Sequence, residues 1–154
     1  GTAMRREFEA SEQLAISKGH LDFAAATEAA HAAALLRAGD ADAAQAIALR
    51  ALDRLPEGSA TSAPMVLAQS ILARIDAATG RLDAARERLA LFGDDVTRSS
   101  SVSRRIALLT ALATLERASG RPEIARGLFD QASELAQGAG RRLEERDLEH
   151  SRDL

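Results

Sequence analysis

The sequence predicts an all-α protein. Ala, Leu, Arg, Glu and Gln, which favour helices, dominate the 154 residues. No stretch shows the period-two alternation of Val, Ile, Thr and aromatic residues that is typical of strands. Gly and Pro are sparse, and they separate the helix-forming stretches from one another. We therefore expect helices joined by short turns and no sheet.

The turns divide the chain into seven helices and a shorter eighth one. Pro56 follows the expected end of a helix and stops it, whereas Pro122 stands in a first turn, where its missing N–H costs nothing. Polar residues around 94–101 form the clearest loop and offer N-caps for the helix that follows. The expected helices cover residues 4–18, 21–38, 41–55, 62–79, 82–92, 99–119 and 122–137, with a short polar helix at 141–150.

Each helix is expected to bury one face. Leu67, Ile71 and Ile75 recur at steps of four, and Ile106, Leu109 and further apolar residues do so at steps of three and four. Hydrophobic types make up 46% of the chain, yet it contains only four Phe and no Trp or Tyr. A core of Ala and Leu requires helices that lie close together.

Composition excludes several classes of protein. Without Cys there are no disulfides, thiolate metal sites or Cys nucleophiles. The net charge is −3 and acidic residues are interspersed with the basic ones, which argues against a nucleic-acid-binding face. No apolar run is long enough for a membrane span or a signal peptide. We expect a cytoplasmic protein, and the preference for Arg over Lys indicates codon bias toward GC-rich DNA.

An internal repeat is visible at the turns. The hexads 39–44, 80–85 and 120–125 share a Gly, a polar residue, an acid in the fourth place and an Ala in the sixth, and their glycines are 41 and 40 residues apart. Gly would take the left-handed conformation that closes one helix, and Ala would let the next helix approach closely. The structural positions of these turns are Gly39, Ala44, Gly80, Ala85, Gly120 and Ala125. Further contact positions follow at Ala48 and Ala51, Leu89 and Phe92, and Phe129 and Ala132.

These hexads and the positions after them resemble the tetratricopeptide repeat (TPR). The unit of about 40 residues is longer than the usual repeat, and is similar to the TPR-like solenoids of maltose-regulon-type bacterial transcription activators. The resemblance implies a right-handed superhelix of antiparallel helix pairs. It divides the chain into a cloning scar (1–3), an N-terminal helix (4–20), three hairpins (21–138) and a polar C-terminal helix or tail (139–154).

The resemblance also implies a groove lined by the first helix of each hairpin. Each helix contributes one arginine to this groove, and three arginines above small side chains would suit a peptide that carries carboxylates. The alternative is that these arginines are ordinary exposed residues paired with neighbouring acids. The groove positions are Ala26, Ala29, Ala33, Leu36 and Arg37; Leu67, Ser70, Arg74, Ala77 and Ala78; and Ala107, Thr110, Thr114, Arg117 and Ala118.

No catalytic constellation is apparent from the sequence. His20, His31 and His150 are scattered, and each is interpreted as a surface or partly buried imidazole. Acid pairs such as 94–95 and 144–145 are adjacent in sequence, so their side chains would diverge and no pocket would shift one pKa. We expect no enzyme activity, no cofactor and no metal.

Three functional hypotheses follow from the sequence. The first is a non-catalytic scaffold or sensor segment of a larger transcriptional or signalling regulator, which binds a protein or peptide partner. The second is a stand-alone adaptor that forms a homodimer through its Ala-rich surface. The third is a helical enzyme or small-ligand binder whose site is not visible in the sequence.

Overall fold

The computed structural model describes residues 2–17, 21–55, 62–93, 98, 101–140 and 149. These residues form α-helices and contain no strand, which confirms the predicted all-α class. The predicted polar helix at 141–150 falls outside the described residues, apart from Glu149. The helices are α1 (Thr2–Ser17), α2 (Leu21–Arg37), α3 (Ala41–Arg54), α4 (Ala63–Ala78), α5 (Leu82–Ala90), α7 (Val102–Ala118) and α8 (Pro122–Gly138).

Several helix boundaries differ from the prediction by one to three residues. α1 begins at Thr2, so two of the three residues assigned to a cloning scar are helical. α5 ends at Ala90 instead of residue 92, and a turn follows in which the Phe92 amide donates to the Leu89 carbonyl oxygen at 3.2 Å. The turn still buries Phe92, as the repeat predicts. No helix in the described part of the chain has the length and the apolar character that crossing a bilayer requires.

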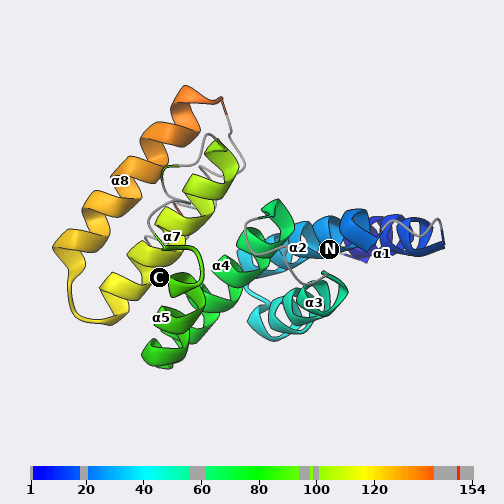
Figure 1. The fold of residues 1–154 in the computed structure, drawn as a ribbon, viewed down its shortest axis with the longest axis horizontal. Coiled ribbons are helices and arrows are strands. Elements are labelled where there is room, and N and C mark those ends of the chain that lie inside the picture. The colour runs from blue at the N-terminus through cyan, green and yellow to red at the C-terminus, as the bar shows by residue number, and fades with distance from the viewer. Residues whose placement is uncertain are drawn as a thin grey trace.

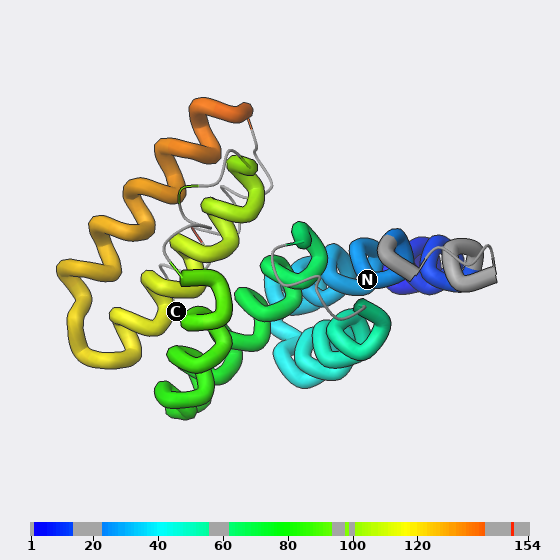
Figure 2. Tube along the Cα trace, viewed as in Figure 1, coloured from blue at the N-terminus to red at the C-terminus, as the bar shows by residue number. Residues whose placement is uncertain are grey.

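The helices form a succession of neighbouring pairs. α2 packs on α3, α4 on α5, and α7 on α8, while α4 also contacts α2, α3 and α7. α1 and α8 lie at opposite ends of this arrangement (Figure 1), and the trace in Figure 2 shows the two helices of the last pair running antiparallel. Each described element therefore contacts its neighbours in the chain and few others.

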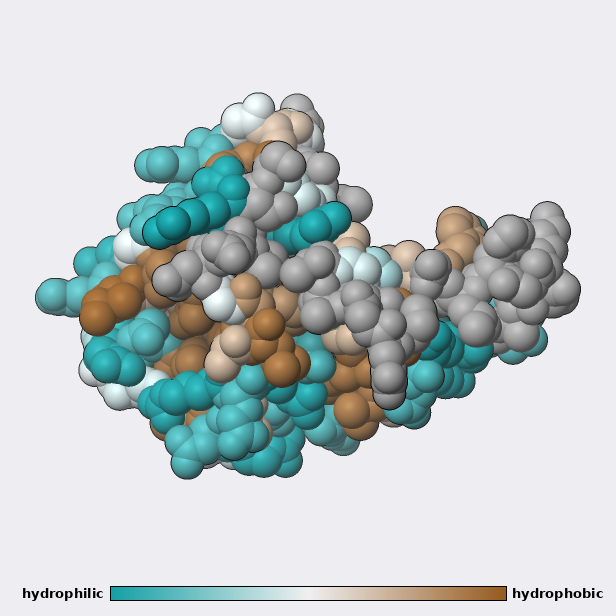
Figure 3. Space-filling model, viewed as in Figure 1, coloured by the Kyte–Doolittle hydropathy of each residue, from teal (hydrophilic) through white to brown (hydrophobic). Residues whose placement is uncertain are grey.

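Among the described residues, the core consists of three successive hydrophobic clusters rather than one. The first joins α2, α3 and α4, the second joins α4, α5 and α7, and the third joins α7 and α8. Alanines occupy many of the fully buried positions in each cluster, so the helices can approach closely. Figure 3 shows hydrophobic surface toward the middle of the face drawn, with hydrophilic residues along its lower edge.

The three repeated turns have the same backbone geometry. Gly39, Gly80 and Gly120 have φ values of 87°, 84° and 82°, which confirms that each closes its helix in the left-handed conformation. In each turn the next amide donates to the carbonyl oxygen five residues back, at 2.8 to 3.0 Å. The alanines in the sixth place, Ala44, Ala85 and Ala125, are at most 2% exposed, so they are the contact points that the repeat predicts.

Side chains stabilise these turns in two different ways. In the second turn Arg81 Nε lies 3.1 Å from Asp76 Oδ1, and in the third Arg121 Nε lies 2.6 Å from Glu116 Oε2. The first turn has Leu35 in place of the acid, and the residue after its Gly is Asp40, whose Oδ1 accepts from the Ala43 amide at 3.1 Å. The second and third turns therefore have both the arginine after Gly and its acidic partner, whereas the first turn has neither. In the first turn Asp40 caps the following helix instead.

Candidate functional site

Two adjoining cavities lie along the first helices of the three pairs. The front cavity, of about 340 Å³, is lined from α2, α4 and α7 and also by Phe8 of α1. The rear cavity, of about 580 Å³, is lined by the C-terminal parts of α2, α4 and α7. Arg74 lines both cavities, so they adjoin at this side chain, and together they are called the groove below. Its dimensions are those of sites that hold small ligands or peptide side chains.

The structure brings all nine candidate groove residues of the prediction to these cavities. Ala33, Arg37, Leu67, Ser70 and Thr110 line the front cavity, Leu36, Thr114 and Arg117 line the rear one, and Arg74 lines both. Of the further positions, Ala77, Ala78, Ala107 and Ala118 also line the groove. The assignment of Ala29 was wrong, because it is fully buried in the cluster between α2, α3 and α4. Ala26 is exposed and lines neither cavity.

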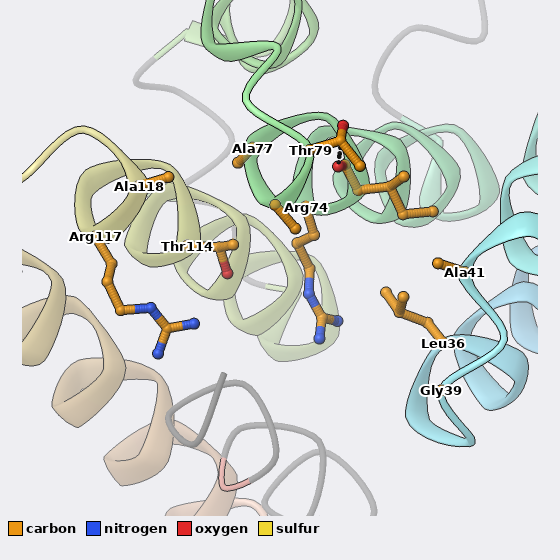
Figure 4. A pocket seen from close by; sticks show the side chains of 11 residues that line it. Leu36, Gly39, Ala41, Arg74, Ala77, Thr79, Thr114, Arg117 and Ala118 are labelled. Atoms are coloured by element: carbon orange, nitrogen blue, oxygen red, sulfur yellow. Dashed lines mark hydrogen bonds between the residues drawn. The ribbon is translucent and has the colours of Figure 1, made fainter.

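The arginines converge on the groove from different helices. Figure 4 shows Arg74 of α4 and Arg117 of α7 extending into the same space, with Leu36 and Ala41 on the opposite side of Arg74. Burial lowers the pKa of Arg117 from its usual value, and the neighbouring positive charge of Arg74 lowers it further. The Arg117 guanidinium also lies 5.5 Å from the centre of the Phe129 ring. Two cations that repel each other favour an anion between them.

Arg74 is only 8% exposed, so the interpretation of the groove arginines as ordinary exposed residues is wrong for this one. Arg37 and Arg117 are partly exposed. A long side chain buries its methylene stem and directs its charged end toward the open side of a cavity. The helix face that was predicted from the repeat therefore places Arg74 at the centre of the groove.

The hydroxyl groups of the groove differ in what they offer a ligand. Thr110 Oγ1 donates to the Ile106 carbonyl oxygen at 2.8 Å, and Thr114 Oγ1 donates to the Thr110 carbonyl oxygen at 2.9 Å. The hydroxyl protons of both threonines are therefore used in hydrogen bonds within α7, and the oxygen atoms can only accept a hydrogen bond from a ligand. Ser70 Oγ is buried and has no hydrogen-bond partner among the described residues, so its proton is available. The guanidiniums and the Ser70 hydroxyl are therefore donors that the groove offers to a ligand.

A second polar cluster was missed by sequence reasoning. Glu28 of α2 is fully buried, and Glu12 of α1 is nearly so. Arg50 Nε lies 2.7 Å from Glu28 Oε2, Arg54 Nη2 lies 3.1 Å from Glu12 Oε1, and Arg54 Nε also contacts Glu28 Oε1. Burial raises the pKa of Glu28, the negative charge of Glu12 raises it further, and the two arginines oppose this shift.

This cluster corrects two predictions. The acid with a shifted pKa is Glu28, and the acid that raises it, Glu12, is 16 residues away in the sequence, whereas only adjacent acids were considered. His31 is 2% exposed and is not a surface or partly buried imidazole. The sequence did contain a signal for this burial. Glu28 and His31 are polar residues in a helix that is otherwise rich in Ala, and such a helix packs on its neighbours along more than one face. The adjacent acids 94–95 and 144–145, as well as His20 and His150, lie outside the described residues.

A scan against protein-family models, a search of curated proteins and a search of solved structures each returned no match to this chain. Within the described residues, no three His, Asp or Glu side chains are grouped so that they could hold a metal ion.

Proposed function

We propose that this chain is a non-catalytic protein- or peptide-binding module, built as a TPR-like right-handed superhelix, whose groove takes an acidic segment of a partner. The repeated turns support this architecture, because three hairpins with the same corner are joined by contacts between successive first helices, α2 with α4 and α4 with α7. In such a stack the first helices line the concave, ligand-binding side.

The position of Arg74 carries the proposal. It lies where the two cavities meet, with Arg37 at the front cavity and Arg117 at the rear one. These three cations come from three different hairpins, so a ligand that contacts all of them must extend along the groove. Guanidiniums form bidentate pairs with carboxylates, and small apolar side chains between them would contact the ligand's stem.

The proposal is tested by selecting peptides on the purified chain from a random display library and measuring their dissociation constants by fluorescence anisotropy. We expect the selected peptides to be rich in Asp and Glu. Arg74→Gln should weaken binding about 10- to 100-fold, because a hydrogen bond to a charged group contributes about 1.5–3 kcal/mol. Raising the salt concentration should weaken binding as well.

The matched control is Arg86→Gln, which removes an arginine of α5 that pairs with Asp83 and does not line the groove cavities. This variant should bind the selected peptides like the wild type. Circular dichroism of each variant verifies that the helices are retained. Selection of neutral or basic peptides, or equal binding by the Arg74 and Arg86 variants, would contradict an acidic-segment groove.

A further inference from the structure

Helix α1 docks on the first hairpin through polar groups. Its Glu12 carboxylate lies 3.4 Å from Arg50 Nη2 and 3.1 Å from Arg54 Nη2, both on α3. Its Phe8 ring stacks on the His31 imidazole of α2, with centroids 4.8 Å apart and planes inclined by 5°. None of the described α1 side chains belongs to the three hydrophobic clusters. Release of α1 would therefore break these ion pairs and the ring contact, and water would hydrate the charged and polar groups that form them.

His31 lies beneath α1 in a place that is unfavourable for a positive charge. Its side chain is buried, and neither Nδ1 nor Nε2 has a hydrogen-bond partner among the described residues. A neutral imidazole has one donor and one acceptor to satisfy, whereas an imidazolium has two donors and a full charge. Protonation in the docked state would bury a cation without an acceptor, and release of α1 would let water solvate it.

The charges around His31 come from two helices, α1 and α3. Arg5 of α1 and Arg50 of α3 disfavour the imidazolium, while Glu9 and Glu12 of α1 favour it. Burial is the largest influence, and it lowers the pKa of His31 below its usual value of about 6.5. The net effect of this environment is that the docked state binds the proton less tightly than a solvated His31 would.

We propose that α1 is a pH-sensitive strap, which stays docked on α2 while His31 is neutral and is released when His31 becomes protonated. Release would also remove Phe8, which lines the front cavity, so the strap controls the shape of one end of the groove. The proposal does not depend on what the groove binds.

The sign of the effect follows from proton linkage. Because the docked pKa of His31 is the lower one, docking is favoured fully above about pH 6.5 and becomes weaker as the pH falls toward the docked pKa. Each pH unit between the two pKa values changes the docking equilibrium tenfold. Glu28 acts in the opposite direction, because burial and Glu12 raise its pKa and its protonation in acid relieves the cost of its burial. The two groups are separated by substituting His31 alone.

The test measures a distance between spin labels on α1 and α3. The chain has no Cys, so Arg6→Cys and Ala46→Cys introduce two thiols at exposed positions of these helices. Electron–electron resonance should give one narrow distance distribution at pH 7.5 and a second, broad population between pH 6.5 and 5. The same measurement on an Ala46→Cys, Ala90→Cys pair, which links α3 to α5, should not change over this range.

NMR titration of the His31 ring in the unlabelled wild-type protein supplies the second measurement. The midpoint of its protonation should coincide with the midpoint of α1 release. His31→Phe keeps an aromatic ring beneath Phe8 without a titrating group and should abolish the acid transition, whereas His150→Phe, the matched control, should retain it. An α1 distance that is constant to pH 5, or a transition that persists in His31→Phe, would overturn the strap.

Discussion

Gly80 tests the geometry of the repeated turn. Its φ of +84° lies in the left-handed region, and a Cβ added to it would meet no other atom within 4 Å. Gly80→Ala therefore changes only the local backbone energy, which costs about 1–2 kcal/mol in that conformation. Alanine also lowers the conformational entropy of the unfolded chain, which offsets about 0.4–1 kcal/mol of this loss of stability. We expect a net loss of about 1 kcal/mol in the free energy of unfolding, equivalent to a melting temperature lower by about 2–4 °C.

The assay is urea unfolding followed by circular dichroism at 222 nm. Gly127 supplies the matched control, because it lies inside α8 and an added Cβ there also meets nothing within 4 Å. Gly127→Ala should stabilise the protein by about 0.5–1 kcal/mol, since glycine is unfavourable within a helix. If both substitutions changed the free energy of unfolding in the same direction, the left-handed backbone conformation would not be the reason that residue 80 is a glycine.

Three further predictions concern packing and charge. Asp76→Asn weakens the ion pairs of a buried carboxylate with Arg81 and Arg88, and should lower the free energy of unfolding in urea by about 2 kcal/mol. Asp83→Asn, at an exposed position, should have no measurable effect. Ala85→Leu should cost about 1–3 kcal/mol by overpacking a fully buried position, and Ala90→Leu, at an exposed one, should be tolerated in the same thermal melt. Because the pKa of Glu28 is raised, the folded state binds its proton more tightly than the unfolded state does. The free energy of unfolding of the wild type, relative to that of Glu28→Gln, should therefore fall as the pH rises from about 4.5 through the folded pKa. A difference between the two proteins that is independent of pH would contradict this.

The turns and their contact points were predictable because they depend on local chemistry. Gly in a left-handed corner and Ala at a helix crossing leave a signal that recurs with the repeat, and the structure confirms both at all three turns. The resemblance to the TPR named the candidate arginines as groove residues, and all three line the two cavities.

The charged cluster beneath α1 was not predictable in the same way. Its members come from three helices, and Glu12 and Arg54 are 42 residues apart in the sequence. A helical pattern shows which residues share a face, but not which face of a neighbouring helix they meet. The pairing of Arg81 with Asp76 escaped notice for a related reason, because the repeat marks the residue after Gly only as polar, while its partner lies in the preceding helix.

Ala29 shows the limit of a small-residue pattern. The side chain of alanine suits both a groove floor and a close helix contact, so composition does not distinguish them. The crossing of α2 with α3 and α4 decides the matter, and it buries Ala29 completely.

The most direct test of the proposed groove is chemical-shift mapping with a selected acidic peptide. In a ¹⁵N-labelled sample, the amides of α2, α4 and α7 that line the two cavities should shift on titration, and those around Arg74 should shift most. The amides on the exposed sides of α3, α5 and α8 should remain unchanged. Perturbations confined to these second helices would show that the protein binds through a different surface and would contradict the account.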